Sequence, residues 1–435
     1  MPVWTTTQKW TFRFFFCFFV LYVCPFPLNE TADWGALGGW TKWLYGASDW
    51  LSGVYRDGLH AIGVWTGAHV LKLGTPITVF ENGSGDTTYN YVIYLVLLVF
   101  AVVGTVAWGI ADRRRRNYEA MYYWLRVIVR YYLGYMMVLY GLYKIYHLQM
   151  PSPFLYQLVQ PFGYKSPMGL AWSFVGYSAG FSAFTGWGEL VGGVLLFFRR
   201  TTTLGAVILV PVLVNVVAIN FSFDVPVKLF SSTLLLMTLF LLAPDMPRLW
   251  KVLLGRQTTE PRREKAALPS RWLRRTRRVI KPIALVLTLL ALLEPVLNYV
   301  AKSKYKGARP HYYGIYNVTA WTRNGQDVPL LITDSARWKR MTVDFDGFAT
   351  VFYTNDSMKT YVFKPDSAFS HVTLYPRGDT AQKALMDIRQ DSLGLALSGI
   401  MSGDTVSIRL LKLDENRFLL VNRGFHWVNE YPLNR

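Results

Sequence analysis

Seven stretches of predominantly apolar residues, six of them 17 residues or longer and the other, the sixth in order, 15 residues long, constrain this chain more than any other feature of its sequence. A helix needs roughly 17–25 such residues to span the hydrocarbon core. Hydrophobic residues make up 52% of the 435-residue chain, which is too apolar for an ordinary soluble enzyme. The sequence therefore predicts an α-helical polytopic membrane bundle of about seven transmembrane helices. The predicted spans are Phe12–Leu28, Tyr91–Ile110, Leu125–His147, Phe174–Phe198, Leu204–Phe221, Lys228–Leu242 and Pro282–Val300.

Positive charge is concentrated at alternate ends of these spans. Arg113–Arg116 follow the second span, Arg199-Arg200 follow the fourth, and residues 248–281 hold twelve Lys or Arg against two Glu. Residues 29–90, between the first two spans, hold three basic and six acidic residues. Because basic residues mark the cytoplasmic ends of spans, the pattern predicts a cell inner (plasma) membrane protein with a cytoplasmic N-terminus and an extracytoplasmic C-terminus. The net charge of +19 is thereby assigned to topology and lipid contact, and no nucleic-acid partner is predicted.

The composition changes after the last span. Within 311–435, polar and apolar residues alternate in short runs separated by turn signals such as Asn324-Gly325 and Asp346-Gly347. Many short antiparallel strands at close spacing predict a C-terminal all-β sandwich or barrel domain. The predicted strands are Tyr316–Trp321, Met341–Phe345, Ala349–Tyr353, Thr360–Phe363, His371–Tyr375, Thr405–Leu411 and Phe418–Asn422.

These features divide the chain into six segments. Tryptophans concentrate between the first two spans, and because indole rings sit at headgroup level, Trp40–Leu73 is predicted to form one or two short amphipathic helices on the membrane surface. The segments are 1–28 (first transmembrane helix), 29–90 (extracytoplasmic interfacial loop), 91–245 (spans two to six), 246–281 (basic cytoplasmic linker), 282–300 (last span) and 311–435 (extracytoplasmic β-domain).

Glu189 is a single carboxylate deep inside an apolar stretch. Its helical neighbours at three and four residues are Thr185, Gly186, Gly192 and Gly193, so the face around it is nearly bare of side chains. An ionisable group in a membrane helix is costly unless it is paired, which makes it a candidate functional residue. Small residues on the same face let another helix approach closely. We therefore expect Glu189 at a helix–helix interface inside the bilayer.

Counting residues along the helices gives Glu189 an expected partner. Glu189 lies ten residues from Arg199, or ~15 Å, and Lys144 lies fourteen residues from Arg130, or ~21 Å, at ~1.5 Å per residue. A lysine stem reaches several ångströms along a helix, so these two groups can meet if their spans are neighbours.

The same counting predicts a polar site in the outer half of the bundle. It is either a pocket that binds a quinone or another head group, or an ion-pair network that only holds the helices together. The candidate ligand-binding residues are Glu189, Lys144, His147, Asn215 and Glu294, and the candidate catalytic residues are Glu189, Lys144 and Glu294.

No metal site is predicted. His60 and His69 are nine residues apart, which places them on opposite faces of a continuous helix. The chain holds no HExxH motif and no Cys–His cluster. Quinone is the one cofactor that the sequence leaves as a candidate.

The spans from Arg126 to Asp245 resemble a known family. Gly141-Leu-Tyr-Lys144, a loop with Pro151 and Pro153, and Gly188-Glu189-Leu-Val-Gly-Gly-Val-Leu-Leu before Arg199-Arg200 are similar to DoxX-type membrane proteins. With its long first loop and β-domain, the chain resembles the larger DoxX-like proteins of the Bacteroidetes type. The resemblance implies a four-helix core, an association with quinone-linked redox complexes, and Lys144 and Glu189 at the polar positions of the pattern.

Three classes of function follow from these observations. The leading hypothesis is an accessory or scaffold component of an envelope redox or assembly complex, in which the β-domain binds an envelope protein partner and the bundle binds quinone or lipid. The first alternative is a quinone-linked membrane oxidoreductase with Glu189 as proton acceptor, although no autonomous catalytic motif is present. The second alternative is a transporter, for which buried charges are also expected.

Overall fold

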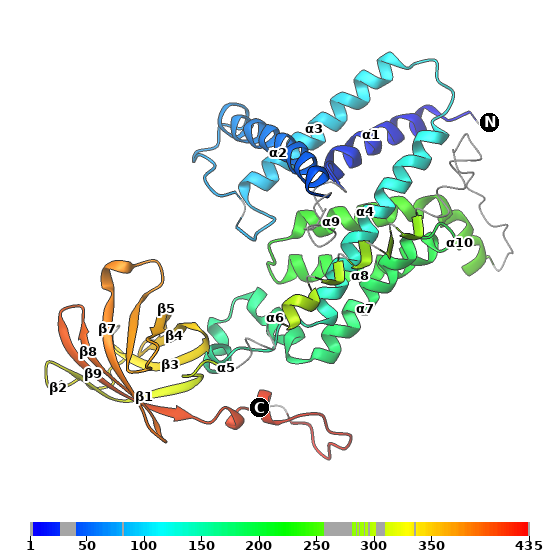
Figure 1. Cartoon of the computed structure of the whole chain (residues 1–435). Helices are drawn as coiled ribbons and strands as arrows, with labels where there is room; N and C mark the ends of the chain where they lie inside the picture. The colour runs from blue at the N-terminus through cyan, green and yellow to red at the C-terminus, as the bar shows by residue number, and fades with distance from the viewer. Residues whose placement is uncertain are drawn as a thin grey trace. The chain divides into compact units, whose positions relative to one another are not determined.

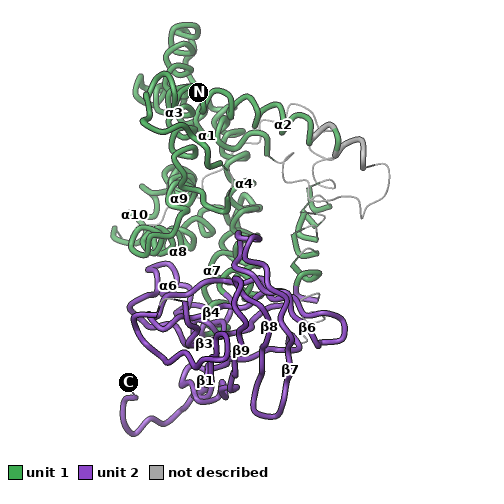
Figure 2. Tube along the Cα trace, turned by 90° about the vertical axis from the view of Figure 1, so that its left-hand side faces the viewer, with its two compact units in different colours: residues 1–150, 178–299 green, residues 151–177, 300–435 purple. Residues whose placement is uncertain are grey.

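The chain folds into two compact units, residues 1–150 with 178–299 and residues 151–177 with 300–435 (Figure 2). Residues 27–40 and 256–280, which include part of the predicted interfacial loop and most of the predicted linker, lie outside the described residues. The computed structural model describes residues 3–26, 41–80, 82–255, 281–283, 285–286, 288–290, 292–294, 296–301, 309–334 and 336–433.

The first unit is built from helices (Figure 1). Among the described residues, four helices are long and apolar enough to cross a membrane: Thr88–Ala111, Thr202–Ser222, Lys228–Leu253 and Lys281–Ala301. Each covers a predicted span. The helices of this unit include α1 (Thr6–Val23), α2 (Thr41–Trp65), α3 (Thr88–Ala111), α4 (Glu119–Ile145), α7 (Ala179–Leu196), α8 (Thr202–Ser222), α9 (Lys228–Leu242) and α10 (Met246–Leu253).

The predicted span Phe174–Phe198 is wrong as one continuous helix. Helix α6 (Pro167–Tyr177) ends and α7 begins on either side of Ser178, which has an extended backbone with φ −115° and ψ 105°. The Ser178 hydroxyl accepts a hydrogen bond from the Phe181 N–H at 3.2 Å and so caps α7. The serine hydroxyl accepts a hydrogen bond from an N–H group of the first turn that has no partner within the helix, and this stabilises the start of a new helix here. Apolar composition alone does not show such a break.

A buried arginine joins α1 to the start of α4. The Arg13 Nη2 donates to the Tyr118 hydroxyl at 2.7 Å and to the Asp112 carbonyl at 3.1 Å. The Tyr118 hydroxyl in turn donates to the Asp112 carboxylate at 3.1 Å. A buried guanidinium is tolerated only with such partners, so this network fixes how α1 packs.

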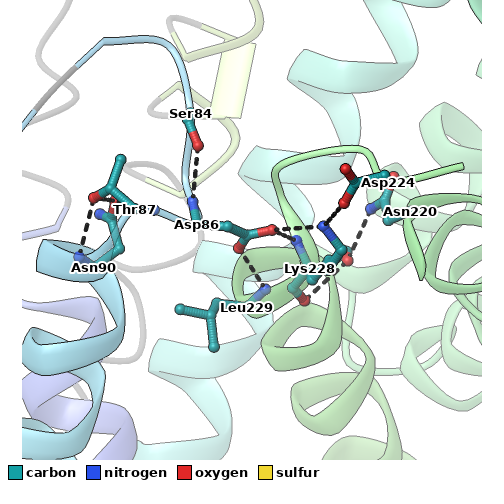
Figure 3. Close-up of polar contacts among 9 residues, drawn as sticks. Ser84, Asp86, Thr87, Asn90, Asn220, Asp224, Lys228 and Leu229 are labelled. Carbon is teal, nitrogen blue, oxygen red and sulfur yellow. Dashed lines mark hydrogen bonds and ion pairs between the residues drawn. The ribbon is translucent and has the colours of Figure 1, made fainter. Parts of the chain in front are cut away.

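Asp86, in the loop before α3, caps α9 from a distant part of the chain (Figure 3). Its carboxylate accepts hydrogen bonds from the Lys228 N–H at 2.7 Å and the Leu229 N–H at 3.1 Å. The Lys228 ammonium lies 3.7 Å from the same carboxylate and 2.9 Å from that of Asp224. The first N–H groups of a helix have no partner within it, so Asp86 completes the start of α9 and ties α3 to it.

The second unit contains an eight-stranded antiparallel barrel. The described residues form nine strands in the order β2-β1-β3-β4-β5-β6-β7-β8-β9, and β1 also pairs with β9 along its length, which closes the sheet. The two-residue β2 only extends β1. The strands are β1 (Gly314–Arg323), β2 (Gln326–Asp327), β3 (Trp338–Phe345), β4 (Gly347–Tyr353), β5 (Met358–Pro365), β6 (His371–Pro376), β7 (Ala384–Gln390), β8 (Gly394–Met401) and β9 (Asp404–Leu413).

Alternate residues of each strand fill the barrel. In β7, Ala384, Met386 and Ile388 are buried while the residues between them are exposed. Trp321 and Trp338 pack edge to face inside the barrel at 5.5 Å between ring centroids. Eight strands enclose an interior that side chains can fill, which is why the alternating sequence closes into a barrel with its own core.

The structure confirms the β-domain and six of its predicted strands, and it also holds strands at β7 and β8 that were not predicted. The predicted strand Phe418–Asn422 is wrong, because Leu419–Asn422 forms a helical turn, α12. A short apolar run does not distinguish a strand from a helix. The remaining helices of this unit are α5 (Leu155–Val159) and α6.

Candidate functional site at the interface of α4 and α7

Glycines line the interface between α4 and α7. Gly134 and Gly141 on α4 face Gly193 and Gly186 on α7, and the two glycines of each helix are spaced seven positions apart. A Cβ atom on Gly134 would lie 3.1 Å from the carbonyl oxygen of Gly193. In a bilayer, helices associate through such close backbone contacts rather than through apolar burial. The bare face predicted around Glu189 is therefore a close helix–helix contact.

Lys144 and Glu189 form an ion pair inside this interface. The Lys144 ammonium donates to the Glu189 Oε1, and the two residues are 6% and 2% exposed. Lys144 lies in the last turn of α4 and Glu189 in the middle of α7. The sequence predicted this contact from depth alone. Each charged group would be costly at this buried position without the other.

Backbone contacts hold the two partners in place. The Ser182 hydroxyl on α7 donates to the Lys144 carbonyl at 2.9 Å, so this oxygen at the end of α4 accepts a hydrogen bond from the neighbouring helix as well as from the backbone that follows α4. A Cβ atom on Gly186 would lie 2.8 Å from the Lys144 Cβ. The lysine stem thus occupies the space that a side chain at residue 186 would fill, and the glycine positions the pair.

One oxygen of the carboxylate lacks a partner. The Glu189 Oε2 is buried and makes no hydrogen bond among the described residues. A buried acceptor without a donor is costly, and such groups are uncommon in native structures. The pair can therefore accept one further hydrogen bond or a proton at Oε2. Lysine carries three N–H donors, of which Glu189 Oε1 takes one.

His147 lies next to the pair, two residues past the end of α4. Its backbone N–H donates to the Lys144 carbonyl at 3.0 Å, and its φ of 58° is left-handed. This conformation is common where an α-helix ends, so His147 terminates α4 at the level of the site. The residue as a whole is partly exposed.

The structure does not bring Asn215 and Glu294 to the pair. Asn215 is exposed on α8, whose buried face holds Leu209 and Leu213. Glu294 is likewise exposed, and the Asn298 side-chain amide donates to it at 3.2 Å. Each residue is two positions from a buried one, about 200° around a helix, so it faces away from the interior. Counting residues gives the height of a side chain along the helix axis, but it does not give the direction in which the side chain points around that axis.

Asn220, which was not predicted as a site residue, is the buried asparagine of α8. Its side-chain amide donates to the Ser231 hydroxyl on α9 at 2.9 Å. It lies seven residues from Leu213, on the same face of α8, and that spacing is the signal that points to it. Among the described residues, no three His, Cys, Asp or Glu side chains gather as metal ligands would.

Comparison with known proteins gives a partial relative. The chain is similar to the uncharacterized protein YwoB of Bacillus subtilis (strain 168), at 47% identity over 76 residues. The matched region is 18% of this chain and 49% of YwoB, so the chain spans about half the length of that relative. No family model matches the chain, and no solved structure matches it.

Proposed function

We propose that this chain is a DoxX-like inner-membrane protein that serves as an accessory or scaffold component of an envelope redox or assembly complex. Its bundle would bind a quinone head group at Lys144 and Glu189, and its β-barrel would bind an envelope protein partner. The observation that carries the proposal is the buried Glu189 Oε2, which accepts no hydrogen bond among the described residues.

The chemistry of the pair suits both redox forms of a quinone. A quinol hydroxyl donates a hydrogen bond and suits Glu189 Oε2, whereas a quinone carbonyl accepts one and suits the Lys144 ammonium. The surrounding glycines leave this polar pair in an otherwise apolar helix interface. Binding sites for small molecules commonly combine apolar walls with a few fixed polar groups.

The proposed topology has seven spans, with the N-terminus in the cytoplasm and the barrel outside. The four candidate spans are joined in this proposal by α1, α4 and α7. The basic runs Arg113–Arg116 and Arg199-Arg200 would then lie on the cytoplasmic side. A periplasm-dependent reporter fused to the C-terminal end should be active, and a cytoplasm-dependent reporter should be inactive. The reverse result would reject this topology.

Quinone bound to the purified protein tests the site. We expect full-length protein in mild detergent to retain quinone that solvent extraction and chromatography detect. The double variant Lys144→Met/Glu189→Met, which keeps no hydrogen-bonding group at the site, should lose it. Glu294→Gln is the matched control, because Glu294 is also a carboxylate on an apolar helix but is exposed, and it should retain the quinone. Absence of quinone from the wild type, or equal retention by all variants, would reject the site.

The oxidoreductase alternative rests on the same oxygen, acting as proton acceptor for a bound quinol. In that case Glu189→Gln would still bind quinone, because an amide can also hydrogen-bond, but quinol-dependent electron transfer would stop. For the accessory function, no such activity is expected from the wild type. Affinity capture from membranes through the barrel should recover a defined envelope protein, and its absence would count against a scaffold.

A further inference from the structure

The chain enters the barrel at one of its two ends, where a turn and two loops also lie. We name it the entry end: it comprises Gly314 at the start of β1, the β3–β4 turn at Asp346-Gly347, the β5–β6 loop (366–370) and the β7–β8 loop (391–393). Register places them together, because Gly314 pairs with Val343 and Gly347 pairs with Phe363. The loop at 328–337 lies at the opposite end, before β3 begins.

Residues 151–177 attach to this entry end. The Asp344 carboxylate on β3 accepts hydrogen bonds from the Leu155 N–H at 2.5 Å and the Tyr156 N–H at 3.3 Å, so it caps α5. Figure 1 shows α5 beside β3. Phe154 packs edge to face on Phe345 at 4.9 Å between centroids. A segment that precedes α7 in sequence is therefore part of the barrel unit.

The entry end and its attached segment expose large apolar side chains. Phe162 is 73% exposed and Leu393 is 62% exposed, and Tyr164, Phe345 and Phe369 are also exposed. They come from four separate places, namely the 3-10 helix Phe162–Tyr164, the last residue of β3, the β5–β6 loop and the β7–β8 loop, so the exposure is not confined to one strand. We call these exposed side chains the apolar face, because large apolar side chains exposed together at one end of a folded domain mark a contact with a membrane or a protein.

The connectivity of the chain favours a membrane over a protein as the binding partner of these side chains. Only Ser178 separates Tyr177, the last residue of α6, from α7, and only residues 302–308 separate the candidate span Lys281–Ala301 from Arg309. Both links lead from the helical unit into the segments that form the entry end. We propose that this apolar face binds the interfacial region of the bilayer that the helices cross, with Phe162 and Leu393 at headgroup depth. Aromatic and apolar side chains at that level are favourable.

Environment-sensitive labels on single cysteines in full-length protein test this contact. In a Cys17→Ala/Cys24→Ala background, Phe162→Cys and Leu393→Cys carry the label at the entry end. Ile332→Cys is the matched control, since Ile332 is 81% exposed but lies at the opposite end. The variants are reconstituted in vesicles with and without lipids that carry a spin label near the headgroup. Near-ultraviolet circular dichroism confirms that each barrel is folded.

We expect spin-labelled lipid to quench the labels at residues 162 and 393 several-fold more than the label at residue 332. Equal quenching at all three sites would overturn the proposal. Blue-shifted emission at residues 162 and 393 without lipid quenching would also overturn it, because it would mean that a protein or a second copy covers the face. The result does not depend on quinone and so is independent of the test of the Lys144–Glu189 site.

Discussion

Gly141 on α4 and Gly186 on α7 lie with their backbones in contact, and each precedes a member of the ion pair by three residues. A Cβ atom on Gly141 would lie 2.8 Å from the Gly186 carbonyl oxygen, and one on Gly186 would lie 2.7 Å from the Gly141 carbonyl oxygen. Because real Cβ atoms do not approach so closely, the two glycines set the distance between the helices. That distance lets Lys144 reach Glu189 within a buried interface.

Gly186→Ala should destabilise the protein by about 1–3 kcal/mol, the usual cost of overpacking, because the added methyl group forces the helices apart. Gly180→Ala is the control on the same helix: its Cβ would meet only the Ser178 hydroxyl oxygen at 3.8 Å, an ordinary contact. Alanine is a better helix former than glycine, so this variant should be at least as stable as the wild type. Thermal unfolding in detergent measures both. Equal stability of the two variants would contradict the close contact.

Lys144→Met should cost about 3–5 kcal/mol, because it leaves the Glu189 carboxylate buried without a counter-charge. Glu189→Met should cost a similar amount. The double variant should recover most of the loss, because two apolar side chains need no partner there. A double-mutant cycle on unfolding free energies measures this coupling. Costs that simply add would show that the two charges do not depend on each other.

Asp86→Ala should destabilise the contact between the loop before α3 and α9 by about 0.5–2 kcal/mol, the range for loss of a helix N-cap. Asp224→Asn is the control, since its exposed carboxylate pairs with the same Lys228 but accepts no hydrogen bond from the backbone of α9, and asparagine tolerates the φ of 50° at this position. Exposed pairs contribute little. Hydrogen exchange of peptides covering the start of α9 should increase in Asp86→Ala alone. An equal increase in both variants would show that the charge, not the cap, matters.

The cap of α5 by Asp344 should make the barrel unit sensitive to pH. Burial raises the pKa of the Asp344 carboxyl above its ordinary value, although the hydrogen bonds from Leu155 and Tyr156 N–H oppose this. The folded state therefore holds the proton more tightly than the unfolded state. Stability from this group is fully present below the ordinary carboxyl pKa and is lost as pH rises through the raised folded-state value.

Asp344→Asn removes this titration but keeps an acceptor for the cap. The stability of Asp344→Asn relative to the wild type should therefore rise between acidic and neutral pH, as measured by near-ultraviolet circular dichroism of the barrel. Asp344→Ala loses the acceptor and should be less stable than Asp344→Asn at every pH. A constant difference between wild type and Asp344→Asn across this range would show that the carboxyl does not titrate abnormally.

The sequence predicted the β-domain well where its alternation was strong. The turn predicted at Asn324-Gly325 is present in the structure, and both of its residues have positive φ. Strand β8, with Gly394, Ser398 and Gly399, lacks a clear alternation, and its position follows from pairing with β7 and β9. Strand pairing between distant segments is a tertiary property, so single-sequence patterns do not reveal it.

The sequence by itself determined that the chain is rich in apolar helices, that a β-domain follows them, and that Glu189 needs a partner such as Lys144. Composition, periodicity and the cost of an unpaired charge in a membrane suffice for these conclusions. Only the tertiary structure decided that the β-domain closes into a barrel, that residues 151–177 belong to it, and that Asn215 and Glu294 lie away from the ion pair. The rotation of a helix and the closure of a sheet depend on contacts between segments far apart in the chain, which no local pattern encodes.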